Sequence, residues 1–398
     1  MPKRKPSLNT IYISERVQEC LRPIARCALT TVVAPMGYGK TTAINWFLAE
    51  KTKGGKAVAI RMSIYSGSIP ILWRSAQDAF RYAGLDVLDA FDFPGDEASA
   101  GRVMEELCRI PVEADLASEL RYRNPLVDEH TLLVVVSQSG ETADTIAAMK
   151  ECKARGARIL AIVNVVGSTI AKLADHVIYT WAGPEIAVAT TKGYTTQVAV
   201  LDMLAVYLAR RLGKLDDQRN KELVEAILQF PSLIQRAIDL NPNLPALAQK
   251  YHGHNDMFFI GRNVDYAASM EGSLKLKEIS YLHSEAYAAG ELKHGTIALI
   301  EKDRPVIALA CYEALFDKMM SNIKEVKARG AQVLAVVLEG NRQIFAEADD
   351  VIFVPRTEAL FNSLPEIVPL QLFAYYVARA NGCDIDKPKN LAKSVTVE

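Results

Sequence analysis

The sequence predicts an α/β protein in which two copies of one doubly wound unit follow each other along the chain. Short apolar runs suited to buried parallel strands recur along the 398 residues, and helical patterns lie between many of them. Residues 153–179 also align without gaps on residues 327–353, with about half of the aligned positions identical. The two observations together predict tandem α/β domains built on one scaffold.

The repeat also predicts how the chain is divided. We expect a first unit over residues 100–240, a second unit over 241–385 and a C-terminal tail over 386–398. Residues 1–99 lie outside the repeat and carry a strand, a Gly-rich turn and a helix of their own. The expected strands are, in order, residues 29–33, 57–60, 131–136, 159–163, 176–179, 257–260, 306–310, 333–337 and 351–354.

Composition and charge narrow the class of function. The 46 basic and 47 acidic residues give a formal net charge of -1, which removes any bulk electrostatic reason to bind nucleic acid. No apolar stretch approaches the roughly 20 residues of a membrane-spanning helix, and no signal-peptide core follows the basic start. The six cysteines lack the spacing of a zinc site or a disulfide framework. We therefore expect a cytoplasmic protein without a metal, a membrane or a nucleic-acid partner.

A hydroxyl-rich turn follows the expected strand at 131–136, and its polar residues are Ser137, Gln138, Ser139 and Thr142. Backbone N–H groups at a helix N-terminus, with hydroxyls beside them, suit a phosphate. Ligands of open α/β sheets also bind at the carboxyl ends of strands. The alternative is a simple capping turn. The alignment of the two repeats pairs residues 137–142 with residues 311–316 of the second unit, which lack these hydroxyls. We therefore expect the two units to differ in ligand binding.

Three charged residues share one face of a predicted helix. Glu271, Lys275 and Glu278 follow each other at i, i+4 and i+7, with apolar residues beside them. A carboxylate there could act as a general base beside an ammonium that stabilises negative charge. An exposed face with ordinary ion pairs is the alternative.

Two further residues are candidates for carbonyl chemistry. His294 lies in a Gly-flanked loop and can titrate near neutral pH, although a surface histidine without function fits the same pattern. Lys393 lies in the C-terminal tail, where a docked lysine could form a Schiff base with a carbonyl substrate. A frayed tail is the alternative.

The N-terminal segment contains a P-loop pattern between a strand and a helix, with Ala34 in place of the usual first glycine. The residues expected to bind ATP and magnesium are Gly37, Gly39, Lys40 and Thr41. No downstream apolar strand ends in the aspartate that such ATPases place on the metal.

From about residue 100 to the end, the chain resembles the isomerase half of glucosamine-6-phosphate synthase, the glutamine:fructose-6-phosphate aminotransferase, which consists of two sugar-isomerase (SIS) domains. The matching stretches are IPVEADLASELRYRNP from Ile110, SQSGETADT from Ser137, AGPEIAVATTK from Ala182, EGSLKLKEISYLHSEAYAAGELKHG from Glu271 and NLAKSVTVE from Asn390.

The resemblance implies a role for each candidate residue. It implies that the hydroxyl-rich turn binds the phosphate of a hexose 6-phosphate. It also implies that Glu278 moves a proton between C1 and C2 with help from Lys275, that His294 opens the sugar ring from a neighbouring subunit, and that Lys393 forms an imine with fructose 6-phosphate. Further residues that it places around the sugar are Val188, Ala189, Thr190, Glu271 and Ala392. A homodimer is implied, and no cofactor is needed by the SIS domains.

The chain departs from this family in two ways. The glutaminase domain with its N-terminal cysteine has no counterpart, since position 2 is Pro2, so we do not expect glutamine-dependent activity from this chain alone. The strand and the Cys-Gly-Thr-Ser loop that open the first SIS domain also have no match. We therefore expect the first SIS domain to lack its opening strand.

Residues 1–100 instead resemble the P-loop start of a MalT/LuxR-type ATP-dependent transcriptional regulator, through APMGYGKTTAINWFLAEK and SIPILWRSAQDAF. The leading hypothesis is an isomerase of the amino-sugar-forming type that acts on fructose 6-phosphate. The alternatives are an ATP-binding fragment of a regulator and an inactive fusion that only binds sugar phosphate.

Overall fold

The structure is a computed structural model, and it describes residues 99–122 and 124–391. The chain divides into one compact unit over Met1–Ala90 and another over Phe91–Glu398, and only the second contains described residues. The expected strands at 29–33 and 57–60, the P-loop residues 37–41, and the tail residues Ala392 and Lys393 lie outside the described residues. No helix in the described part is long and apolar enough to cross a membrane.

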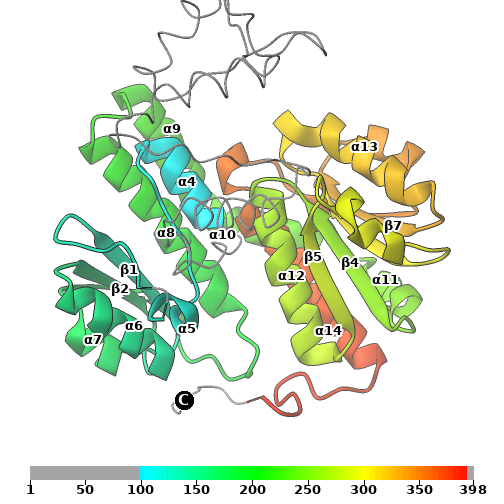
Figure 1. Cartoon of the computed structure of the whole chain (residues 1–398). Helices are drawn as coiled ribbons and strands as arrows, with labels where there is room; N and C mark the ends of the chain where they lie inside the picture. The colour runs from blue at the N-terminus through cyan, green and yellow to red at the C-terminus, as the bar shows by residue number, and fades with distance from the viewer. Residues whose placement is uncertain (1–98, 123, 392–398) are drawn as a thin grey trace, which may run out of the picture. The chain divides into compact units, whose positions relative to one another are not determined.

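The first domain contains a parallel sheet of three strands in the order β1-β2-β3 (Figure 1). Its elements are α4 Ser99–Cys108, α5 Ala117–Leu120, β1 Leu132–Ser137, α6 Ala143–Ala154, β2 Arg158–Val163, α7 Thr169–Leu173, β3 His176–Tyr179 and α8 Lys192–Arg211. Three helices then lead to the second sheet, namely α9 Asp217–Leu228, α10 Phe230–Asp239 and α11 Leu244–Tyr251.

The second domain contains a parallel sheet of five strands in the order β5-β4-β6-β7-β8. Its strands are β4 Asp256–Gly261, β5 His283–Ala288, β6 Pro305–Leu309, β7 Gln332–Leu338 and β8 Asp350–Val354. Its α-helices are α12 Val264–Ser280, α13 Phe316–Lys327 and α14 Ser363–Ala380. Its short 3₁₀ helices are η2 Leu292–His294, η3 Thr296–Leu299, η4 Glu313–Leu315, η5 Gln343–Ala346 and η6 Ala359–Phe361.

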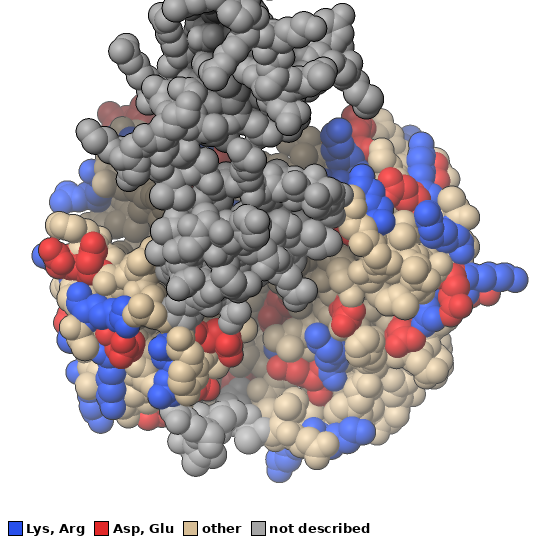
Figure 2. Space-filling model, in the orientation of Figure 1, with Lys and Arg blue, Asp and Glu red and all other residues tan. Residues whose placement is uncertain are grey.

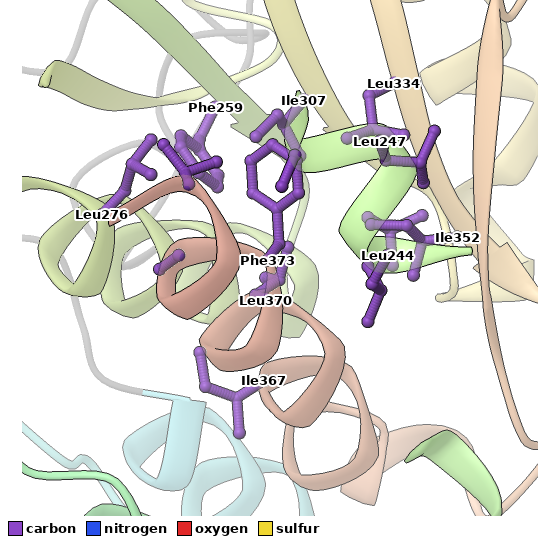
Figure 3. Close-up of a cluster of buried hydrophobic side chains, with 14 of the residues drawn as sticks. Leu244, Leu247, Phe259, Leu276, Ile307, Leu334, Ile352, Ile367, Leu370 and Phe373 are labelled. Carbon is purple, nitrogen blue, oxygen red and sulfur yellow. The ribbon is translucent and has the colours of Figure 1, made fainter. Parts of the chain in front are cut away.

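Both faces of the second sheet are buried, as its continuous apolar strands require. Phe259, Ile307 and Leu334 point to one face, where α11, α12 and α14 cover them (Figure 3). Phe258 and Val306 point to the other face, which packs against α13. This double burial fixes α12, the helix that carries the predicted charged stripe, between the sheet and α14.

The seven strands expected after residue 130 are present, each within one or two residues of its predicted ends. The fold therefore confirms the α/β class with two repeated parallel-sheet domains. One strand was not predicted: β5, with the sequence HSEAYA, forms the edge of the second sheet. Its polar and small residues suit an edge strand. For this reason β5 lacks the apolar run that marks the other strands.

The described part of the first sheet has no counterpart of β4. In the second sheet β4 lies between β5 and β6, so Val306 and Ala310 are only 0% and 2% exposed. The repeat offset aligns these two with Leu132 and Val136, which are 46% and 38% exposed along β1. β1 is therefore an edge strand among the described residues.

The two copies also end their first described helix alike. α4 is followed by Arg109 at φ 56° and α12 by Tyr281 at φ 62°, both in the left-handed region. β5 begins at His283, whereas residues 110–116 after α4 form no strand. Because β5 pairs only with β4, its counterpart has no strand to join among the described residues.

On the face of the described part that Figure 2 shows, basic and acidic side chains are interspersed, without a large area of one sign. This distribution agrees with the near-zero net charge. It gives no electrostatic footprint for nucleic acid on that face.

Helix α8 carries a buried carboxyl group that has no hydrogen-bond partner in the described part. Asp202 is 1% exposed, and both of its carboxylate oxygens are unpaired. Its neighbours on the same helix face, Val198 and Ala205, are buried apolar residues. Burial raises the pKa of Asp202 well above its ordinary value. The carboxyl group therefore lowers the stability of the folded protein at any pH at which the same group is ionised in the unfolded chain.

We predict that Asp202→Leu stabilises the protein by about 1–3 kcal/mol at neutral pH, because it removes an unsatisfied buried polar group. The native carboxyl holds its proton more tightly than the unfolded one, so the stability of the original chain falls as pH rises above the ordinary aspartate pKa of about 3.9. The gain should therefore grow from pH 4 to pH 7 in urea denaturation. The exposed Asp239→Leu is the control, and a gain that does not change with pH would contradict the prediction.

Candidate functional site

The hydroxyl turn, residues 137–142, joins the carboxyl end of β1 to the N-terminus of α6. The Ser137 hydroxyl accepts the Gly140 N–H at 3.0 Å, and the Ser139 hydroxyl accepts the Glu141 N–H at 3.2 Å. Thr142 is the N-cap residue, but its side chain makes no capping bond. The serines thus shape the turn itself, while the N-terminus of α6 retains the positive end of its dipole.

Glycine is required at position 140. Its φ is 67°, and an added Cβ would lie 2.1 Å from the Ser168 hydroxyl oxygen. The Gly140 carbonyl accepts the Ile170 N–H at 3.0 Å, and the Glu141 carboxylate accepts both the N–H and the hydroxyl of Thr169. The hydrogen bonds from Thr169 lower the pKa of Glu141. Hydrogen bonds therefore hold the turn against the start of α7.

The equivalent turn in the second domain is occupied by a carboxylate of the protein itself. The repeat offset aligns Ser137 and Gln138 with Cys311 and Tyr312, whose N–H groups both donate to Asp265 Oδ2, at 2.9 and 3.0 Å. Asp265 is buried, and burial raises its pKa to about 6. This arrangement gives a physical basis for the asymmetry expected between the two copies.

The charged stripe of α12 forms a buried ion cluster of Glu271, Lys275 and Glu278. Lys275 Nζ lies 3.4 Å from Glu271 Oε1 and 2.5 Å from Glu278 Oε2. Lys275 is only 5% exposed, so the stripe is not an ordinary solvent-exposed helix face. Burial raises the pKa of Glu271 to about 7, although the ammonium opposes the rise.

The loop between β3 and α8 reaches the second domain. The Val188 N–H donates to the Asp386 carbonyl at 3.0 Å, and Gln371 Nε2 on α14 donates to the Thr191 carbonyl at 3.4 Å. Ala189 is buried in the same apolar cluster as residues of α12 and α14, and Thr190 is half-buried beside it. The three residues expected around the sugar thus lie where the two domains meet.

His294 and Glu278 of one chain are not brought together. Glu278 lies in the last turn of α12, before β5 begins, whereas His294 is exposed in η2, after β5 has ended. The Ala289 N–H donates to the Gly261 carbonyl, which places the segment before η2 at the end of β4 where α12 starts. The 17 residues of α12 span about 25 Å, so the two side chains lie toward opposite ends of this helix.

Two features of the structure were not predicted. Asp265 is backed by Glu366 of α14, whose pKa burial raises well above its ordinary value. Tyr281 contacts Lys389 near the chain end, since its hydroxyl accepts the Lys389 N–H at 2.8 Å. Neither pair has a sequence pattern, because each joins residues that are far apart along the chain. In the described part, no group of three His, Cys, Asp or Glu side chains is placed to hold a metal.

Comparisons with known proteins agree with the fold. Residues 98–207 and 250–379 match the SIS domain family. The glutamine–fructose-6-phosphate aminotransferase [isomerizing] of Clostridium tetani is 54% identical over 295 residues, which are 74% of this chain and 48% of that protein. The enzyme of the same name from Symbiobacterium thermophilum is 54% identical over 308 residues, 76% of this chain and 51% of that protein. The chain thus spans about half the length of the curated relatives it matches.

A solved structure covers the same region. The C-terminal domain of glucosamine-fructose-6-phosphate aminotransferase from Francisella tularensis superposes with a TM-score of 0.69 at 34% identity, over 73% of this chain and 82% of that one. Since the SIS match includes more than half of the chain and the Francisella domain is covered over most of its length, the chain belongs to the SIS domain family, in the branch that contains the C-terminal domain of glucosamine-fructose-6-phosphate aminotransferase.

Proposed function

We propose that this chain binds fructose 6-phosphate and catalyses ketose-to-aldose isomerisation of the type used in amino-sugar synthesis. The observation that carries the proposal is the buried ion cluster of α12, in which a carboxylate lies 2.5 Å from a buried ammonium. Moving a proton between C1 and C2 of a sugar needs a base and a positive charge that stabilises the enol-like intermediate. The relatives named as aminotransferases support the choice of substrate.

In the proposed reaction the hydroxyl turn binds the phosphate, and the Lys393 amine attacks C2 with loss of water to form an imine. Ammonia displaces the lysine from this imine, and Glu278 then takes a proton from C1 and returns it to C2, which gives glucosamine 6-phosphate. Without ammonia, water hydrolyses the imine, and the same proton transfer on the free ketose gives glucose 6-phosphate. In both cases the ammonium of Lys275 stabilises the negative charge that develops between the two proton transfers. Lys393 and its neighbour Ala392 lie outside the described residues, so their part rests on the resemblance alone.

A homodimer is part of the same proposal. His294 is exposed and lies toward the opposite end of α12 from Glu278, so it cannot open a sugar ring held at Glu278 of its own chain. A second copy that presents its His294 would complete the site. The exposure of His294 in this chain supports that role.

A sugar-phosphate binder without turnover is the second candidate. The hydroxyl turn follows an edge strand whose Val136 is 38% exposed, so the first domain has less support around its phosphate site than the second domain has around β6. The ATP-binding alternative falls on residues outside the described part, and no observation there favours it.

We predict that the chain with fructose 6-phosphate yields glucose 6-phosphate, and glucosamine 6-phosphate when ammonia is added. Glu278→Gln should lower kcat by about 10²-fold or more, because it removes the proposed general base, while the affinity for the sugar phosphate is kept. Product formation and calorimetric binding are the two measurements. Binding without any turnover in the original chain would favour the second candidate.

A pair of glycine variants tests the hydroxyl turn. Gly140 and Gly213 both have φ 67°, but only Gly140 has atoms within 4 Å of an added Cβ. Both substitutions to alanine carry the left-handed strain of about 1 kcal/mol, and only Gly140→Ala also meets Ser168. We predict that Gly140→Ala weakens fructose 6-phosphate binding at least tenfold and that Gly213→Ala does not.

The double variant Gly140→Ala/Ser168→Gly should recover part of this affinity, because it removes the Ser168 side chain that the new methyl group meets. Isothermal calorimetry measures all three variants. Equal affinities for Gly140→Ala and Gly213→Ala would show that the phosphate binds elsewhere.

A further inference from the structure

We infer that Tyr281 is a positioning residue that holds the C-terminal strap, residues 384–391, against the end of α12. The inference rests on the proposed function, because the strap leads to the proposed imine-forming lysine. The strap itself lies within the described part of the chain.

Two contacts join Tyr281 to the strap. Its hydroxyl accepts the Lys389 N–H at 2.8 Å, and Lys389 Nζ lies 4.3 Å from the centroid of its ring. The first is a directed hydrogen bond to the backbone, and the second is a cation–π contact. Together they fix both the backbone and the side chain of one strap residue on one tyrosine.

Other contacts hold the strap on either side of this point. The Asp386 carbonyl accepts the Val188 N–H, and Pro388 is buried although its neighbours are exposed. Asp384 Oδ1 accepts the N–H groups of Asp386 and Lys387, at 3.0 and 2.9 Å. The strap is therefore a formed turn that also contacts the loop expected around the sugar.

The backbone at Tyr281 is a second reason to single out this residue. Tyr281 ends α12 at φ 62°, a conformation for which glycine is the least costly residue. Arg109 has the same conformation at the end of α4, so the turn alone explains the backbone angle but not the choice of tyrosine. Tyr281 differs from Arg109 in its aromatic ring and hydroxyl, and these are the groups that contact Lys389.

Chain geometry links this anchor to the proposed chemistry. Lys393 follows Lys389 by four residues, which span at most about 14 Å when fully extended. Glu278 precedes Tyr281 by three residues, about one helical turn. Fixing Lys389 on Tyr281 therefore sets an upper limit on how far position 393 can lie from the end of α12 that carries Glu278.

Hydrogen exchange and kinetics test the inference on the full chain. Tyr281→Phe deletes the acceptor and keeps the ring, whereas Lys389→Met keeps the N–H and deletes the ammonium. We expect the Lys389 amide to exchange about fivefold faster in Tyr281→Phe, the factor for one lost hydrogen bond. We also expect kcat and borohydride trapping of the imine to fall by a similar factor, with KM unchanged because the phosphate binds at the hydroxyl turn.

The control is Tyr122→Phe, an exposed tyrosine in the first domain, which should change neither exchange in the strap nor kcat. Exchange at Lys389 as slow in Tyr281→Phe as in the original chain would overturn the inference, even in an active enzyme. A raised KM with unchanged kcat would also overturn it. If the original chain shows no turnover, the catalytic role of Tyr281 is lost together with the proposed function. The exchange rate of the Lys389 amide still shows whether Tyr281 holds the strap.

Discussion

The ammonium of Lys275, buried between two carboxylates of its own helix, is the interaction on which the candidate site depends. A buried lone ammonium would cost several kcal/mol, and the neighbouring carboxylates offset that cost. The two are not equivalent, because the side chain of Glu271 is 12% exposed and that of Glu278 is 23% exposed. The shallower carboxylate, which is also the closer to the ammonium, is the more accessible of the two to a substrate. Helix geometry fixes the spacing of the three side chains, and the packing of α12 against α14 and the sheet sets how deeply each one is buried.

The duplicated scaffold uses the same backbone position in two ways. In the first domain the turn after β1 carries hydroxyls and opens onto a helix N-terminus. In the second domain the corresponding N–H groups of Cys311 and Tyr312 are bound by Asp265. A carboxylate that is already part of the fold loses no translational freedom on binding, so a free phosphate competes poorly with it. Under the proposed function, this leaves the first copy to bind the phosphate and the second to present α12.

Sequence patterns predicted those parts that depend on local periodicity. The apolar runs located seven strands, and the i, i+4, i+7 spacing placed Glu271, Lys275 and Glu278 on one helix face. β5 was not predicted, because an edge strand needs no apolar run. The contacts of Asp265 and Tyr281 were not predicted, because their partners lie on distant segments of the chain. Burial also could not be read from the charged stripe, since the same spacing occurs on exposed helices. It follows from the packing of α12 against α14 and the sheet, which is a property of the whole domain.

That same dependence on neighbours explains how the hydroxyl turn keeps its shape beside an edge strand. Three of its backbone or side-chain groups are held from the β2 side: the carbonyls of Gln138 and Gly140 accept N–H groups of residues 164 and 170, and the Glu141 carboxylate binds Thr169. None of these bonds involves a strand on the side of β1 that faces away from β2. An opening strand like β4 would cover the exposed side chains of β1, but the turn at its carboxyl end is already fixed by the connection between β2 and α7. The turn can therefore form on the three strands that the described residues contribute.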